Sequence, residues 1–145
     1  MKFFDCFMYH DEDLILDIRL NTLDNYINKF VIIESKFDHQ GNEKKLNFNM
    51  YNFQKFKDKI IYKIIEAFPS NQTNWERENF QRNFITKGLS DASNDDYIII
   101  SDVDEIPNLA NLKNFKEYKY TVFQQTMFYY KITLLNTTYP IRLGS

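Results

Sequence analysis

Residues 97–107 read Tyr-Ile-Ile-Ile-Ser-Asp-Val-Asp-Glu-Ile-Pro, and the interpretation of the rest of the chain depends on this stretch. Its apolar run is typical of a strand buried on both faces, as in a parallel sheet. Carboxylates inside a buried strand would lose their hydration at high cost, so Asp102, Asp104 and Glu105 are expected at its carboxyl end. Ligands bind at that end in open α/β sheets. The stretch therefore predicts a candidate binding site.

The spacing of Asp102 and Asp104 allows two interpretations. An extended backbone would point the two side chains to opposite faces, whereas a turn beginning at Val103 would bring both toward one cation or diphosphate. Aspartate also favours turns and helix caps for purely structural reasons. An EF-hand loop is not expected, because Ile106 and Pro107 stand at its fifth and sixth positions without a glycine.

Composition restricts the class of protein. The 145 residues carry 18 basic and 20 acidic side chains, a formal net charge of −2, which does not favour a nucleic-acid partner. The length suits a single domain over residues 1–145. The one cysteine, Cys6, excludes an internal disulfide and is expected in the core. Without a visible signal peptide or transmembrane run, we expect a soluble, cytoplasmic protein; nothing indicates its oligomeric state.

Apolar periodicity predicts alternating strands and helices ahead of the fourth strand at 97–100. The predicted strands are residues 2–9, 30–33 and 60–65, and the predicted helices are residues 11–27, 51–57 and 75–89. Asn74 is expected to cap the last of these helices. Beyond Pro107, a short helix is expected within 109–118, followed by strands at 120–130 and 131–135. Strand, helix and strand at this spacing predict a right-handed βαβ unit and an α/β fold with a mainly parallel sheet.

Acidic residues stand at the ends of all four predicted strands. They are Glu12 with its neighbours, Glu34, Glu66 and the Asp102–Glu105 group. Like charges repel, so a hard divalent cation held by a few carboxylates and by ligand phosphates would account for the cluster. The structural alternative is that several of these acids cap helices.

A second group of polar residues lies on the predicted helix after Asn74. It comprises Trp75, Glu76, Arg77, Glu78, Asn79, Gln81, Arg82 and Asn83. Glu78 and Arg82 are four apart and can simply pair on a solvated face. Trp75, Asn79, Arg82 and Asn83 also follow one stripe, which could hold a nucleotide diphosphate or sugar hydroxyls.

Several segments together resemble glycosyltransferase family 17, the family of the β-1,4-mannosyl-glycoprotein β-1,4-N-acetylglucosaminyltransferases. They are residues 5–7, 12–14, 18–20, 30–35, 75–83 and 99–107. The match is collinear, and the blocks at 75–83 and 99–107 are specific in combination. The resemblance implies a GT-A type nucleotide-sugar-binding fold, a Mn²⁺ or Mg²⁺ ion, a UDP-sugar donor such as UDP-N-acetylglucosamine, and inversion at the anomeric carbon.

The resemblance also implies roles for individual residues. Asp104 would bind the metal, Asp102 would contact the metal or the ribose, and Glu105 is the nearby candidate for a catalytic base. Tyr9, Glu12 and Glu34 sit where such folds hold the uridine. Further contacts to the donor would come from Arg77, Arg82 and Asn83. The acceptor would be a glycan or polysaccharide.

Two alternatives stay open at this point. Members of the family are longer, so the acceptor-binding half and the base are expected beyond this chain, which would then be a non-catalytic nucleotide-sugar-binding module. A phosphotransferase of the haloacid dehalogenase type also uses Asp-x-Asp after a strand. In that class the motif usually lies on the first strand, whereas here it follows the fourth.

Overall fold

The computed structural model describes residues 1–38, 40–111 and 119–125. The chain divides into two units, Met1–Ile106 and Pro107–Ser145. The first unit holds the sheet and all residues predicted to form the site. In the second, the 3-10 helix η3 (Leu109–Asn111) lies within the predicted helix at 109–118, and the remainder of that helix is outside the described residues. The prediction of a single domain stays a prediction.

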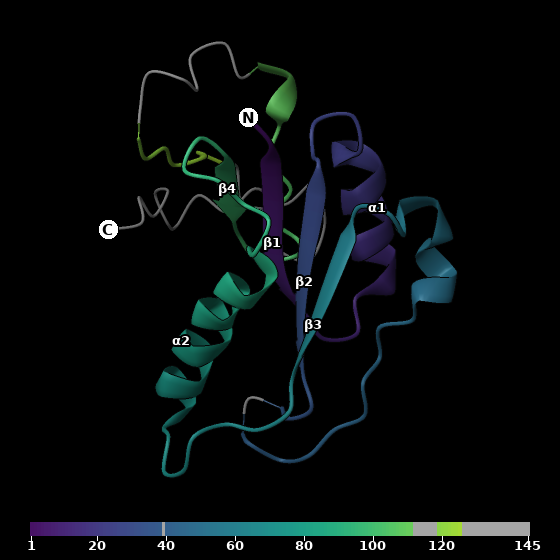
Figure 1. Ribbon diagram of the computed structural model, residues 1–145. Helices are drawn as coiled ribbons and strands as arrows, with labels where there is room; N and C mark the ends of the chain where they lie inside the picture. The colour runs from purple at the N-terminus through teal and green to yellow at the C-terminus, as the bar shows by residue number, and fades with distance from the viewer. Residues whose placement is uncertain (39, 112–118, 126–145) are drawn as a thin grey trace. The chain divides into compact units, whose positions relative to one another are not determined.

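The first unit is built on four parallel strands, β1 (Phe3–Tyr9), β2 (Lys29–Ser35), β3 (Ile60–Ile65) and β4 (Tyr97–Ile100). Their order across the sheet is β3-β2-β1-β4 (Figure 1). Cys6 in β1 is in register with Val31 on one side and with Ile100 on the other. The predicted α/β class with a mainly parallel sheet is confirmed, as are the four strands.

Two helices cover opposite faces of this sheet. α1 (Asp13–Leu23) lies against the face that carries Asp5 and Phe7, since Arg19 of α1 contacts both side chains. α2 (Asn74–Phe84) and the 3-10 helix η2 (Ile85–Gly88) pack on the other face, where Phe4 and Cys6 point. Successive strand residues alternate between faces, so the two helices lie on opposite sides, as Figure 1 shows.

The connection from β2 to β3 contains the 3-10 helix η1 (Met50–Phe56) in place of the short helix predicted at 51–57. Its Phe53 and Phe56 are buried, and the ring of Phe56 meets Phe30 edge to face. Phe30 is in register with Asp5, so η1 lies on the α1 side of the sheet.

The N-terminus of α2 corrects one prediction. Thr73, not Asn74, is the cap: its hydroxyl accepts from the backbone N–H of Glu76, and the Glu76 carboxylate accepts from the backbone N–H of Thr73. This is the capping box, whose Ser/Thr-x-x-Glu pattern the sequence contains at 73–76. The predicted helix was also too long at the other end, because its last turn tightens into η2 at Ile85.

β4 corrects a second prediction. The strand is not buried on both faces: Ile99 is 4% exposed, but Ile98 and Ile100 are 37% and 55% exposed. Ile98 and Ile100 are in register with Phe4 and Cys6, so they lie on the α2 face. β4 is the last strand of the described sheet, and α2 and η2 pack over β1, β2 and β3 instead.

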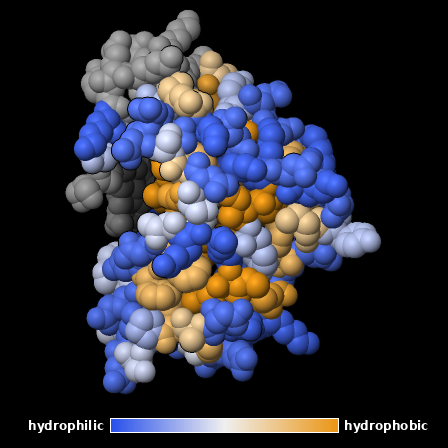
Figure 2. All heavy atoms as spheres, in the orientation of Figure 1, coloured by the Kyte–Doolittle hydropathy of each residue, from blue (hydrophilic) through white to orange (hydrophobic). Residues whose placement is uncertain are grey.

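Four further observations complete the fold. The helix predicted at 11–27 is shorter in the structure, ending at Leu23. Residues 121–125 are not part of a strand, contrary to the prediction for 120–130, and residues 126–135 lie outside the described residues. No helix of the described part of the chain is long and apolar enough to cross a membrane. Figure 2 shows hydrophobic residues emerging between hydrophilic ones on one face of the molecule.

Candidate functional site

The strand order places the Asp102–Glu105 segment at a topological switch point. From β1 the chain proceeds to β2 and β3 on one side, and it then returns to place β4 on the other side of β1. The loops that leave the carboxyl ends of β1 and β4 therefore diverge, which opens a crevice in sheets of this type. The segment begins two residues after β4 ends, at the carboxyl edge of the sheet.

The backbone of this segment turns at Val103 and Asp104, so the extended alternative does not hold. That the turn brings both carboxylates toward one cation or diphosphate stays a prediction. The N–H of Glu105 donates to the carbonyl of Asp102 at 3.0 Å, and the N–H of Ile106 donates to the carbonyl of Asp104 at 3.1 Å. Val103 points inward and is 7% exposed. The side chains of Asp102, Asp104 and Glu105 are exposed.

The donor set suits a hard cation that is bound together with a ligand. Within residues 1–38, 40–111 and 119–125, no three Asp, Glu, His or Cys side chains converge on a ready-made metal site. Mg²⁺ characteristically keeps several waters and takes only one or two carboxylates besides substrate phosphates, and Mn²⁺ favours the same oxygen ligands. Two exposed carboxylates, Asp102 and Asp104, match that demand. Glu105 uses its Oε2 to accept from the N–H of Asp102 at 3.2 Å.

Arg82 brings α2 to the turn. Its Nη2 lies 3.2 Å from Oδ1 of Asp102 and 3.4 Å from Oε1 of Glu78. The pairing of Arg82 with Glu78 along the helix is confirmed, and Arg82 also reaches Asp102. Its contact with a diphosphate or a sugar stays a prediction. An arginine beside a carboxylate at a switch point is well suited to a phosphate, because its planar fork matches two phosphate oxygens.

The other predicted residues of α2 lie differently. Arg77 donates to the carbonyl of Gln40 at 3.1 Å and to Oδ1 of Asn74 at 3.2 Å, which ties the helix to the loop after β2. The structure therefore does not bring Arg77 to Asp102. Asn83 is exposed on the third turn of the helix. For both residues, contact with a donor stays a prediction.

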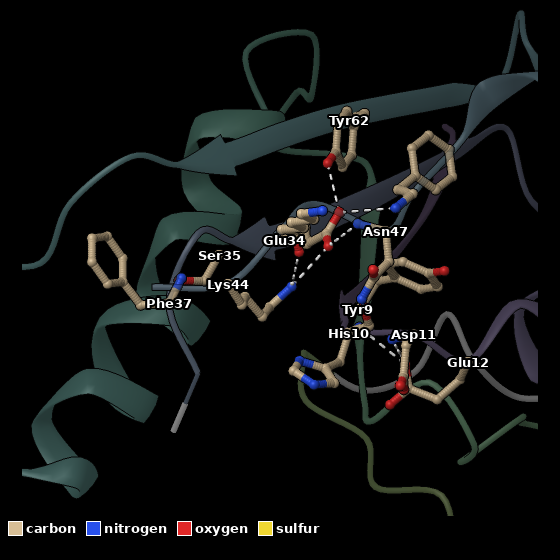
Figure 3. Close-up of polar contacts among 12 residues, drawn as sticks. Tyr9, His10, Asp11, Glu12, Glu34, Ser35, Phe37, Lys44, Asn47 and Tyr62 are labelled. Carbon is tan, nitrogen blue, oxygen red and sulfur yellow. Dashed lines mark hydrogen bonds and ion pairs between the residues drawn. The ribbon is translucent and has the colours of Figure 1, made fainter. Parts of the chain in front are cut away.

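Glu34 lies at the carboxyl end of β2, and its carboxylate accepts four hydrogen bonds (Figure 3). The donors are Tyr62 Oη at 2.6 Å, Asn47 N at 2.7 Å, Lys44 Nζ at 2.9 Å and Phe48 N at 3.1 Å. Burial alone would raise the pKa of Glu34, but these donors outweigh it and hold the pKa below its ordinary value of 4.5. Glu34 thereby anchors the loop after β2 over the edge of the sheet; its predicted contact with uridine stays a prediction.

Tyr9, the last residue of β1, is in register with Glu34, and Glu12 follows just before α1 begins (Figure 3). The hydroxyl of Tyr9 donates to Oδ1 of Asp13 at 2.6 Å. Burial and then the Asp13 carboxylate raise the pKa of Tyr9. Oε2 of Glu12 accepts from the N–H groups of His10 and Asp11 at 3.0 and 3.1 Å. The three residues predicted to hold uridine thus come from the ends of two adjacent strands, β1 and β2.

Sequence reasoning assigned no role to Arg19, which is buried and contacts the turn. Its guanidinium pairs with Asp5 and also donates to backbone carbonyls of the turn after β4. The sequence did contain a signal, because Asp5 interrupts an apolar strand and Arg19 interrupts an apolar stretch of helix. Two opposite charges at buried positions indicate a pair, since each alone would be costly to bury.

Comparison with known proteins agrees with this architecture. The family model described as glycosyltransferase family 17 matches residues 1–130. The chain belongs to glycosyltransferase family 17. The match includes the Asp102–Glu105 turn, α2 and the strand ends that carry Tyr9 and Glu34.

Three curated family relatives are similar to this chain over 108 residues, which cover 68% of it. Each is named beta-1,4-mannosyl-glycoprotein 4-beta-N-acetylglucosaminyltransferase; the human and rat proteins are 34% identical to this chain and the mouse protein 33%. The match spans about a fifth of each relative, 20% of its length. No solved structure matches the chain significantly. Membership of the family, with the motif after the fourth strand, gives no support to the phosphotransferase alternative.

Proposed function

We propose that this chain forms the donor-binding part of a metal-dependent glycosyltransferase. The donor would be a UDP-sugar, with UDP-N-acetylglucosamine the first choice, and the acceptor a glycan. Family membership and the names of the relatives support this proposal. The observation that carries it is the exposed Asp102–Glu105 turn at the switch point, with Arg82 3.2 Å from Asp102.

Each group at the turn has a proposed role. Asp104 and Asp102 would hold Mn²⁺ or Mg²⁺, which would supply Lewis-acid stabilisation of the negative charge on the departing UDP. Arg82 would bind a phosphate oxygen of the diphosphate while also compensating the charge of Asp102. Tyr9 and the residues around Glu34 would border the uridine.

Transfer of the sugar itself is proposed for a protein that has the full length of the relatives. An acceptor hydroxyl would attack the anomeric carbon opposite the leaving UDP, which inverts that carbon, and a carboxylate would take up its proton. Glu105 is the candidate for that base among residues at the turn. Because the match spans about a fifth of the relatives, a second proposal is that this chain binds the donor without transferring the sugar.

Isothermal titration calorimetry with UDP-N-acetylglucosamine, with and without Mn²⁺, tests the proposal. We expect binding that depends on Mn²⁺ and that falls at least about tenfold in Asp104→Asn, the loss typical of changes around a metal. Asp95→Asn is the matched control: it removes the same charge from an exposed aspartate at the opposite, amino end of β4. Binding that ignores Mn²⁺, or that Asp104→Asn leaves unchanged, would contradict the proposal. Tight binding without sugar transfer to any glycan would favour the binding module.

A further inference from the structure

The guanidinium of Arg19 uses all of its N–H groups inside the protein. Nε and Nη2 donate to the two carboxylate oxygens of Asp5 at 2.8 and 2.7 Å, and Nη2 also donates to Oγ of Ser101 at 2.7 Å. Nη1 lies 2.8, 3.1 and 3.2 Å from the carbonyl oxygens of Asp102, Val103 and Glu105. The side chain is 0% exposed, so water does not compete for these bonds.

These contacts connect the turn to the central sheet. Asp5 lies in β1 and is in register with Phe30 on one side and Ile99 on the other, so two neighbouring strands fix its position. Arg19 itself is fixed on α1, and its guanidinium lies over the ring of Phe7 at 4.6 Å. A chain of contacts therefore runs from the sheet through Asp5 and Arg19 to the backbone of the turn.

The direction of the carbonyl groups in the turn affects where the side chains of the turn lie. Three carbonyl groups of one short turn point inward at a single guanidinium, and Val103 is buried with them. The carboxylates of Asp102 and Asp104 are exposed on the same turn. A guanidinium presents five donors in a rigid planar fork, whereas an ammonium group is a single point with three donors, so lysine cannot span Asp5 and the carbonyls in the same way.

We propose that Arg19 is a positioning residue that sets the conformation of the Asp102–Glu105 turn. It would thereby place the carboxylates of Asp102 and Asp104 toward a divalent cation. Asp5 fixes the orientation of the Arg19 guanidinium. Arg19 touches neither the cation nor the donor. The consequence for cation binding rests on the proposed function, but the effect on the turn does not.

Two measurements on the full chain test this inference. Hydrogen exchange reports on the backbone N–H groups of Glu105 and Ile106, which close the turn. In Arg19→Lys, we expect these two amides to exchange about tenfold faster or more while the amides of β1 and β2 keep their protection, because a turn can open locally without global unfolding. Mn²⁺ affinity in the presence of UDP should fall by about 10- to 100-fold, as for other residues that orient metal ligands.

A second variant covers the case in which Arg19→Lys fails to fold. The double variant Asp5→Leu/Arg19→Met removes both buried charges, keeps apolar volume in the core and should give the same faster exchange at Glu105 and Ile106. The control is Lys59→Met, which removes a cation that bonds the end of α1 through Asp24, at the amino edge of the sheet. It should leave both turn amides unchanged.

The outcomes separate this inference from the proposed function. Turn amides that exchange within about twofold of the wild-type rate in a folded Arg19 variant would overturn the inference. Unchanged Mn²⁺ affinity with a loosened turn would also overturn the claim that Arg19 places the carboxylates. If the wild-type chain shows no Mn²⁺-dependent UDP binding, the proposed function fails, and the exchange data still decide whether Arg19 sets the turn.

Discussion

The guanidinium of Arg19 and the carboxylate of Asp5 form a two-bond pair at 2.7 and 2.8 Å, with both side chains 0% exposed. Burial raises the pKa of Asp5, and the guanidinium opposes that shift by favouring the ionised form. The same chain contains an exposed pair of the same residue types, Arg82 and Asp102, at 3.2 Å. The two pairs allow the effect of burial on stability to be compared for the same two residue types.

Arg19→Ala should lower the free energy of unfolding by about 3–5 kcal/mol, because it leaves the Asp5 carboxylate buried without its partner. Arg82→Ala is the matched control and should cost at most about 1 kcal/mol, since its partners are about half exposed and hydrated when unpaired. Urea denaturation of both variants measures the difference. Equal losses would mean that the Arg19 pair is less desolvated than its geometry indicates.

Arg82→Ala should act on ligand binding instead. Removal of a charged donor to a phosphate is expected to weaken UDP affinity by about tenfold or more, since such hydrogen bonds contribute about 1.5–3 kcal/mol. Lys87→Ala removes an exposed cation from η2, five residues beyond Arg82 in the sequence, and should leave affinity unchanged. Calorimetry at two salt concentrations measures UDP affinity for both variants. A general effect of net charge would appear in Lys87→Ala as well, whereas loss of the Arg82 contact would not.

Glu34 makes the stability of the loop after β2 depend on pH. The pKa of Glu34 is lowered in the folded state, so its contribution is fully present above its ordinary value of 4.5 and is lost as the pH falls through the lowered folded-state value. Wild type should therefore exceed Glu34→Gln in unfolding free energy by about 1.5–3 kcal/mol at neutral pH. The gap should narrow as the pH is lowered below 4.5.

Denaturation at a series of pH values checks this dependence on Glu34. Glu66→Gln is the control, because Glu66 at the end of β3 has a largely exposed side chain paired with Lys36 at the surface. Its difference from wild type should stay small across the same range. A Glu34→Gln gap that is independent of pH would contradict the assignment of the stabilisation to the ionised carboxylate.

The capping box at α2 gives a prediction that distinguishes neighbouring residues. Thr73→Ala should destabilise the protein by about 1 kcal/mol, because it removes the acceptor for the Glu76 N–H and the donor to its carboxylate. Asn74→Ala, one position later, should change stability by less than about 0.5 kcal/mol, as is usual for exposed positions. Thermal unfolding of the two variants compares them directly; a larger loss in Asn74→Ala would contradict the assignment of Thr73 as the cap.

Gly88 permits close contact between η2 and β2. A Cβ at this position would lie 2.3 Å from Cγ1 of Val31, so Gly88→Ala should cost about 1–3 kcal/mol through overpacking. The loss should be smaller when it is measured in a Val31→Ala background, because the conflicting methyl group is then gone. Identical losses in the two backgrounds, in a double-mutant cycle of unfolding free energies, would contradict this account.

Much of the fold follows from local pattern, which explains why the four strands and the two principal helices were predicted. The carboxyl-edge position of Asp102 also followed from a local argument, the cost of burying carboxylates in a strand. The exposure of Ile98 and Ile100 could not be predicted in this way. It depends on the position of β4 in the sheet and on which strands α2 covers, and both are properties of the tertiary arrangement.

The site shows the same division between local and distant information. Tyr9, Glu12 and Glu34 follow strand ends, so their neighbourhood could be predicted, but the four donors to Glu34 come partly from a loop without periodicity. The shortest hydrogen bond from Arg19 to the backbone of the turn goes to the carbonyl of Asp102, which lies 83 positions later in the sequence. Such a link needs the β1–β4 pairing to be known first, and no spacing along the chain encodes it.

The position of Cys6 provides a means of timing the opening of the fold. Its thiol is 0% exposed at the centre of β1, and burial raises its pKa, so it is shielded from alkylating reagents in the intact sheet. Since the chain has no other cysteine, each alkylation event would record one opening large enough to expose the central strand. The rate of Cys6 alkylation would thus measure how often the sheet opens. A ligand that binds only the folded state would lower this rate in proportion to the occupancy of its site.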